Sequence, residues 1–156
     1  LDVVAPLAVL STMTAWRSRA DPLPSATVVV LAGVNVVAVV AWHVPVLFDA
    51  AERSLPLHVA EHLSFVLAAC ALWWAAGLGA RPAPPLAVLV VFVASLPGIA
   101  LGAGMTLSTA PWYTAYPSIV DQQLAGALMW SVGGAVTVLC GALCAARWLS
   151  AAEVGA

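Results

Sequence analysis

The stretch LHVAEHLSFVLAACALWWAAGLG, residues 57–79, places two histidines and a glutamate at the start of a long apolar run. A helix needs ~20 residues to cross the ~30 Å hydrocarbon layer of a bilayer, and this run is long enough. Polar side chains in such a helix are costly and tend to mark function. The stretch therefore predicts a membrane-spanning helix with a functional site in its first turns.

The composition of the whole chain also indicates a membrane protein. Of the 156 residues, 63% are hydrophobic and 8% are charged, whereas soluble domains carry roughly 25% charged residues. The net charge is −2 and no basic tract is present, which argues against nucleic-acid binding. The three cysteines lie inside apolar runs and predict no disulfide framework. We expect one transmembrane domain over residues 1–156.

Four further apolar runs predict the remaining helices. They cover about residues 3–16, 26–44, 86–107 and 122–148. Polar or proline-rich breaks separate the runs, at residues 17–25, 45–56, 79–85 and 108–121. Strands are not expected, because the open edges of a sheet cannot lie in lipid. The predicted fold class is all-α, a polytopic transmembrane bundle of about five helices.

The arginines predict how the chain crosses the membrane. Arg17, Arg19, Arg81 and Arg147 share one side of a five-helix chain, and Arg53 lies on the other. Because basic residues concentrate in cytoplasmic loops, we expect the N-terminus outside and the C-terminus in the cytoplasm of a bacterial plasma membrane. Aromatic residues in the last outer loop are expected as anchors at the membrane interface: Trp112, Tyr113 and Tyr116.

All three histidines fall at the predicted outer face. His58 and His62 are four residues apart, so their imidazoles share a helix face about 6 Å apart. Pro45 and Pro56 mark the end of one helix and the start of the next, which brings His43 to the same depth. Three imidazoles suit Cu, Zn, Fe or Ni. The pattern predicts a metal site at His43, His58 and His62, facing outward.

Other polar residues near this face are candidates for an extra ligand or for a hydrogen-bond partner of a ligand: Asp49, Glu61, Met105, Asp121 and Gln122. A carboxylate often accepts the second N–H of a metal-bound imidazole, and a thioether suits Cu(I). The alternative is structural. Polar residues at a helix start also serve as caps and dipole partners, as Asp121 is placed to do.

The five residues HVAEH, 58–62, also match H-x-x-E-H, a zinc protease signature. Such a protease needs a further ligand and a substrate cleft, for which a compact five-helix chain offers little room. No serine-nucleophile, phosphate-loop or C-x-x-C motif is present. We therefore expect that the protein is not an enzyme.

Several blocks together resemble the CtaG family of cytochrome c oxidase assembly factors, the multi-helix type named for the caa3 oxidase. They are WHVPVLFDAAERSLPLHVAEHLSF (42–65), Trp73 and Trp74, Arg81 and Pro82, and DQQLAGALMW (121–130). The resemblance covers about residues 42–148. Larger family members have more helices, including a histidine-containing helix upstream, and no histidine precedes His43 here.

The resemblance implies an integral membrane protein that matures the copper-containing oxidase. The patterned polar positions of the family fall on His43, Asp49, His58, Glu61, His62, Asp121, Gln122 and Gln123. We expect copper to bind the histidines and to pass to oxidase subunits or a copper carrier. Two alternatives stay open: a subunit that holds haem b between His43 and His58 or His62, and a purely structural accessory subunit.

Overall fold

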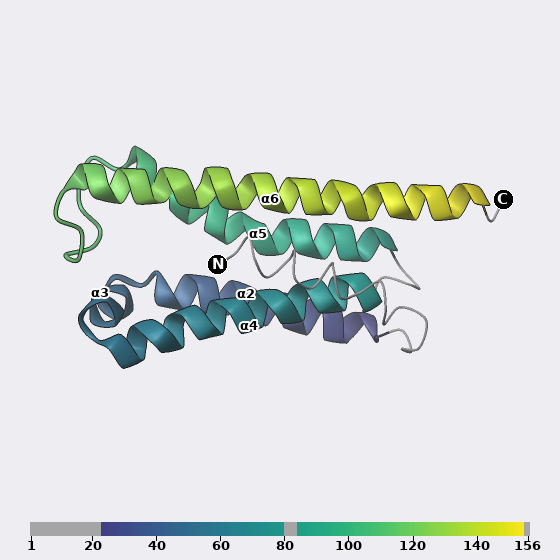
Figure 1. Cartoon of the computed structure of the whole chain (residues 1–156), viewed down its shortest axis with the longest axis horizontal. Coiled ribbons are helices and arrows are strands. Elements are labelled where there is room, and N and C mark those ends of the chain that lie inside the picture. The colour runs from purple at the N-terminus through teal and green to yellow at the C-terminus, as the bar shows by residue number, and fades with distance from the viewer. Residues whose placement is uncertain (1–22, 80–83, 155–156) are drawn as a thin grey trace.

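The computed structural model describes residues 23–79 and 84–154, which form five helices (Figure 1). They are α2 (Ser25–Trp42), α3 (Pro45–Arg53), α4 (Leu55–Gly79), α5 (Pro84–Leu107) and α6 (Ile119–Val154). No strand occurs in these two ranges. The prediction of an all-α bundle is confirmed, while the first apolar run, residues 3–16, lies outside the described residues.

Three helices of the described ranges are long and apolar enough to cross a membrane: Ser25–Trp42, Leu55–Ala76 and Val88–Leu107. Helix α6 has 36 residues, about 54 Å of helix. The C-terminal end of α6 extends well past α5 (Figure 1). Arg17, Arg19 and Arg81 lie outside the described residues, so the orientation across the membrane stays a prediction.

The segment 45–56, expected as a break between helices, contains α3. Pro45 begins this helix, where its missing N–H costs nothing and its fixed φ suits a helix. Ala51 on the inner side of α3 is fully buried, at 0% exposure. Helix α2 ends at Trp42, and Pro56 lies in the first turn of α4. The prolines therefore delimit three helices rather than two.

The apolar core lies where α2, α4 and α5 meet, in the half of the bundle away from α3. Its buried members are Val28, Ala32, Leu72, Trp73, Ala75, Ala76, Val90, Val91 and Ala94. Because lipid is as apolar as these side chains, close packing rather than exclusion of water holds such helices together. The alanines permit that closeness. Toward α3, the Trp42 indole N–H donates to the Ser64 hydroxyl over 2.8 Å and ties α2 to α4.

Helices α5 and α6 form the most extensive helix pair, and two glycines allow it. A Cβ placed on Gly126 would lie 2.6 Å from the Gly102 carbonyl oxygen and 2.7 Å from the Met105 Cβ. A Cβ on Gly102 would lie 2.9 Å from the Gly126 carbonyl oxygen. Met105, considered above as a thioether ligand, is 2% exposed and belongs to this contact. The two backbones could not approach so closely with side chains at these positions.

We expect Gly126→Leu to destabilise the protein by about 1–3 kcal/mol, because the added side chain forces the two helices apart. Gly134→Leu is the matched control on the same helix, since a Cβ there meets nothing within 4 Å. Unfolding in detergent micelles, followed by circular dichroism, measures both. Equal stability of the two variants would contradict the close contact of α5 with α6.

Candidate metal centre

One end of the bundle gathers the polar side chains. Helix α2 ends there, α3 lies beside it, α4 begins there, and the loop from α5 to α6 folds over the same end (Figure 1). We call this region, residues 42–62 and 108–123, the polar end. The sequence predicted that these segments lie at one level, and the arrangement of the helices confirms it.

His58, Glu61 and His62 form a group that could hold a metal ion. Each offers one ligand atom, and the three atoms lie within 4.8 Å of one another. All three residues lie in the first two turns of α4, and the two imidazole rings are 4.2 Å apart between centroids. Glu61 is buried at 4% exposure, whereas the side chains of His58 and His62 are 40% and 41% exposed. The group thus has a buried carboxylate and an open imidazole face.

The local hydrogen bonds assign the protons of two imidazoles. Nδ1 of His62 lies 2.9 Å from the His58 carbonyl oxygen, and Nδ1 of His43 lies 2.7 Å from the Val39 carbonyl oxygen. A carbonyl oxygen only accepts, so each Nδ1 carries the hydrogen. The lone pair of a neutral imidazole then lies on Nε2, the atom left for a metal.

A second carboxylate reaches the group from α3. Glu52 Oε1 lies 3.5 Å from His58 Nδ1, and Glu61 Oε2 lies 3.8 Å from that same nitrogen. Both distances exceed those of normal hydrogen bonds, so the contacts are electrostatic. Glu52 was not among the predicted ligands. The signal for it is the helical pattern of residues 45–53, which places Glu52 one helix turn after Phe48, on the side that faces α4.

His43 lies outside this group of three. Its ring stands at the end of α2 with the rings of Phe48 and Phe65 at 6.3 and 6.1 Å between centroids. Helix α2 and its cap determine this position, because the Nδ1 hydrogen bond to Val39 folds the ring back along the helix. The structure brings two of the three predicted histidines together and leaves the third among aromatic rings.

Asp49 serves the loop between α5 and α6. Its carboxylate accepts hydrogen bonds from the Thr114 hydroxyl at 2.7 Å, the Thr114 N–H at 3.2 Å and the Ala115 N–H at 3.0 Å. Arg53 donates to the same Thr114 hydroxyl oxygen over 2.6 Å. The hydrogen bond from the Thr114 hydroxyl, above all, holds the pKa of Asp49 below its ordinary value. Its oxygens are directed at the loop rather than at an imidazole.

Asp121 and Gln122 hold the start of α6. The Ser118 hydroxyl donates to Asp121 over 2.7 Å and accepts the Asp121 N–H at 3.3 Å, so Ser118 is the cap and Asp121 supports it. The Gln122 amide, fully buried, accepts the Trp112 N–H at 2.6 Å and donates to the Ala110 carbonyl. Neither side chain belongs to the group of His58, Glu61 and His62.

Tyr113, expected as an anchor at the membrane interface, is instead buried at 2% exposure. Its hydroxyl donates to the His43 carbonyl oxygen over 2.9 Å, and its ring lies 4.2 Å from that of Phe48 between centroids. This bond satisfies a carbonyl that the end of α2 would otherwise leave free. Burial raises the pKa of Tyr113 to about 12, so the hydroxyl stays a donor. No local signal in the sequence indicates this contact.

Acid should loosen the loop that Asp49 holds. Because the pKa of Asp49 in the folded protein lies below its ordinary value of 3.8, its bonds are intact above that value and are lost as the pH falls through the folded pKa. We expect the hydrogen-exchange protection of the Thr114 and Ala115 amides to fall on acidification. Asp49→Ala should remove the protection already at pH 7. An unchanged pH dependence in that variant would contradict this role of Asp49.

Comparison with known proteins identifies the family. The profile described as Cytochrome c oxidase caa3 assembly factor (Caa3_CtaG) matches residues 4–151. No curated protein and no solved structure matches the chain. The match confirms the resemblance seen in the sequence and extends it toward the start of the chain. Because it covers nearly the whole sequence, the chain belongs to the caa3 cytochrome c oxidase assembly factor family.

Proposed function

We propose that this protein binds copper at the polar end and passes it to a cytochrome c oxidase subunit or a copper carrier. The observation that carries the proposal is the group of His58, Glu61 and His62, with ligand atoms within 4.8 Å, in a protein of an oxidase assembly family. The description of the family supports a role in assembly and favours a binding protein over an enzyme.

The donor set fits copper better than the other metals that assembly would handle. Imidazole binds Zn, Cu, Fe and Ni, and Cu(II) has the highest affinity of the divalent series for a given nitrogen site. The nearest cysteine on α4, Cys70, lies eight residues after His62, about 12 Å deeper along the helix. A site of imidazole and carboxylate without thiolate holds copper less tightly than a cysteine site. Weaker binding suits a protein that must release its metal.

Exposure supports transfer as well as capture. His58 and His62 have side chains 40% and 41% exposed, so an incoming ligand can reach a metal held on them. Glu61 lies behind them and Glu52 beside them, and their negative charge attracts a cation. Copper would be captured on the Nε2 atoms and then leave by ligand exchange with a docked acceptor.

His43 has a secondary role in this proposal. Its Nε2 is free of hydrogen, but a turn of its side chain is needed before it could join the other two histidines. We propose that it supplies a third ligand during capture or release rather than a permanent one. The site would face the outside of the plasma membrane, as the arginine distribution predicts.

We expect purified protein in nanodiscs to bind one copper ion per chain. His58→Ala and His62→Ala should each abolish tight binding, because each removes one of two neighbouring ligands. His43→Ala should weaken binding less. Elemental analysis and competition with a chromogenic copper chelator measure stoichiometry and affinity. The matched control is the distant Ser131→Ala, whose hydroxyl bonds to the Ala127 carbonyl of its own helix.

Glu61→Gln tests the buried carboxylate, because the amide keeps the shape and loses the charge. We expect copper affinity to fall by about 10- to 100-fold, the usual effect of losing a group that supports metal ligands. Glu52→Gln should have a smaller effect, since Glu52 is 42% exposed in its side chain and solvated.

Three results would overturn the copper proposal. The first is the absence of bound copper in the wild-type protein, and the second is unchanged binding when all three histidines are replaced. The third is a Soret absorption band in the purified protein, which would favour the haem alternative.

A further inference from the structure

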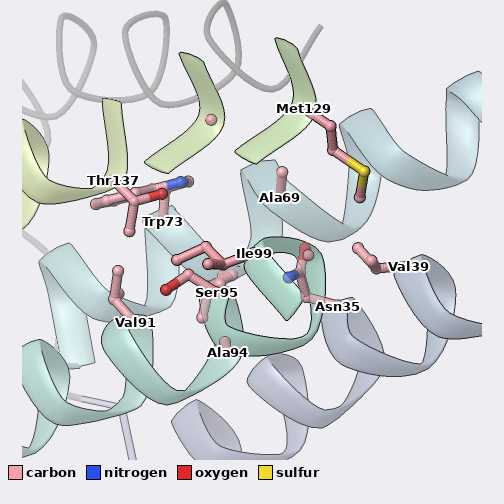
Figure 2. Close-up of a pocket in the computed structure, with 13 residues that line it drawn as sticks. Asn35, Val39, Ala69, Trp73, Val91, Ala94, Ser95, Ile99, Met129 and Thr137 are labelled. Carbon is pink, nitrogen blue, oxygen red and sulfur yellow. The ribbon is translucent and has the colours of Figure 1, made fainter. Parts of the chain in front are cut away.

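A cavity of about 110 Å³ lies inside the bundle and shares part of its lining with the apolar core (Figure 2). All four long helices line it. Most of the lining is apolar, from residues such as Leu72, Val91 and Ile99. Each helix also contributes one polar side chain: Asn35 from α2, Trp73 from α4, Ser95 from α5 and Thr137 from α6.

The cavity lies at the depth of the membrane interior. Asn35 is ten residues after the start of α2 at Ser25, or about 15 Å along a helix of 18 residues. Water is scarce at that depth, so a polar side chain without a partner there is destabilising. An asparagine in the middle of an apolar span therefore requires a reason.

The hydrogen bonds of the described residues leave donors or acceptors free on each of these four polar groups. Among the described residues, no hydrogen bond is formed by the Asn35 amide, the Trp73 indole N–H or the Thr137 hydroxyl. Trp73 is nevertheless 7% exposed, more than nine-tenths buried. The Ser95 hydroxyl donates to the Phe92 carbonyl over 2.7 Å, which leaves its oxygen able to accept. Figure 2 shows these four side chains around the cavity.

The chemistry of the lining restricts what can occupy the space. No charged residue is among the described residues that line the cavity, so nothing in this lining compensates a charged ligand in a medium where charge is very costly. The amide, the indole and the free hydroxyl offer several donors, which match an oxygen that accepts. A volume of about 110 Å³ is smaller than the ~300 Å³ or more of pockets that enclose a whole small molecule.

We propose that this cavity binds the head of a neutral membrane lipid, with a carbonyl or hydroxyl oxygen held by Asn35, Trp73 and Thr137. The acyl chains remain in the bilayer. A protein embedded in lipid meets such molecules at high local concentration, and the mostly apolar wall suits the carbon atoms next to the oxygen. This site is separate from the proposed copper site, because none of the lining residues that the structure describes belongs to the polar end.

Gly133 provides a direct test. It lines the cavity, and a Cβ placed there meets nothing within 4 Å, so Gly133→Leu fills the space without a clash in the backbone. Gly134→Leu makes the same chemical change one residue further along α6, where a Cβ also meets nothing within 4 Å. Gly134 does not line the cavity.

The probe is dioleoylglycerol, an uncharged lipid with one hydroxyl and two ester carbonyls, added to the purified full chain and followed by native mass spectrometry. We expect one saturable adduct on the wild-type protein and on Gly134→Leu. Adduct formation should fall at least about tenfold in Gly133→Leu. Copper binding should be unchanged in both variants, which separates failure of this proposal from failure of the copper proposal.

A second pair of variants tests the polar contacts without changing the volume. Asn35→Leu and Thr137→Val should each weaken the adduct. Ser131→Ala removes a hydroxyl from α6, the helix of Thr137, but outside the cavity, and it should leave the adduct unchanged. No adduct on the wild-type protein, as when water or another segment of the chain fills the cavity, would overturn the proposal. Equal adducts on the Gly133→Leu and Gly134→Leu variants would overturn it too.

Discussion

The polar end depends on one constraint: backbone hydrogen-bonding groups at the helix ends and in the loop need partners. Each helix terminus leaves backbone groups without partners inside the helix, and near lipid they cannot all rely on water. Here side chains from other segments supply the partners. Tyr113 donates to the carbonyl of His43, the residue that follows α2; Asp49 accepts two amide hydrogens of the loop, and Gln122 accepts a third. The loop between α5 and α6 thereby ties α6 to α2 and α3.

This network explains how the bundle holds a defined site at the end away from its apolar core. The apolar core lies in the other half and consists mainly of alanine, valine and leucine on α2, α4 and α5. Helix α6 packs onto these helices through the contact of Gly126 with Gly102 on α5. Near α3, the bond between Trp42 and Ser64 fixes α2 against α4, and Ser64 in turn donates to the Glu61 carbonyl at 2.7 Å. The histidine group therefore stands on a helix that hydrogen bonds hold in place.

Asp49 and Glu61, two carboxylates of the polar end, have different roles because their neighbours differ. Asp49 faces backbone and hydroxyl donors, which stabilise its charged form and occupy its oxygens. Glu61 faces two imidazoles at 3.8 and 3.9 Å and is shielded from solvent. The first carboxylate organises the loop, and the second lies beside His58 and His62. Under the copper proposal, this division keeps the loop in place while the metal is bound and released.

The sequence by itself determined the class of the protein, three of its apolar helices, the family, and the neighbourhood of His58 and His62. These follow from local rules, namely the length of apolar runs, the i,i+4 spacing and the residue blocks at 42–65 and 121–130. Only the tertiary structure decided that Glu52 rather than Asp49 lies beside His58, and that Tyr113 is buried with its hydroxyl on the His43 carbonyl. It also separated His43 from the other histidines and opened a mostly apolar cavity, with four polar side chains in its lining, between four helices. Those outcomes depend on contacts between residues far apart in the chain, as between His43 and Tyr113, and the pattern of neighbouring residues does not encode which side chain will satisfy a distant backbone group.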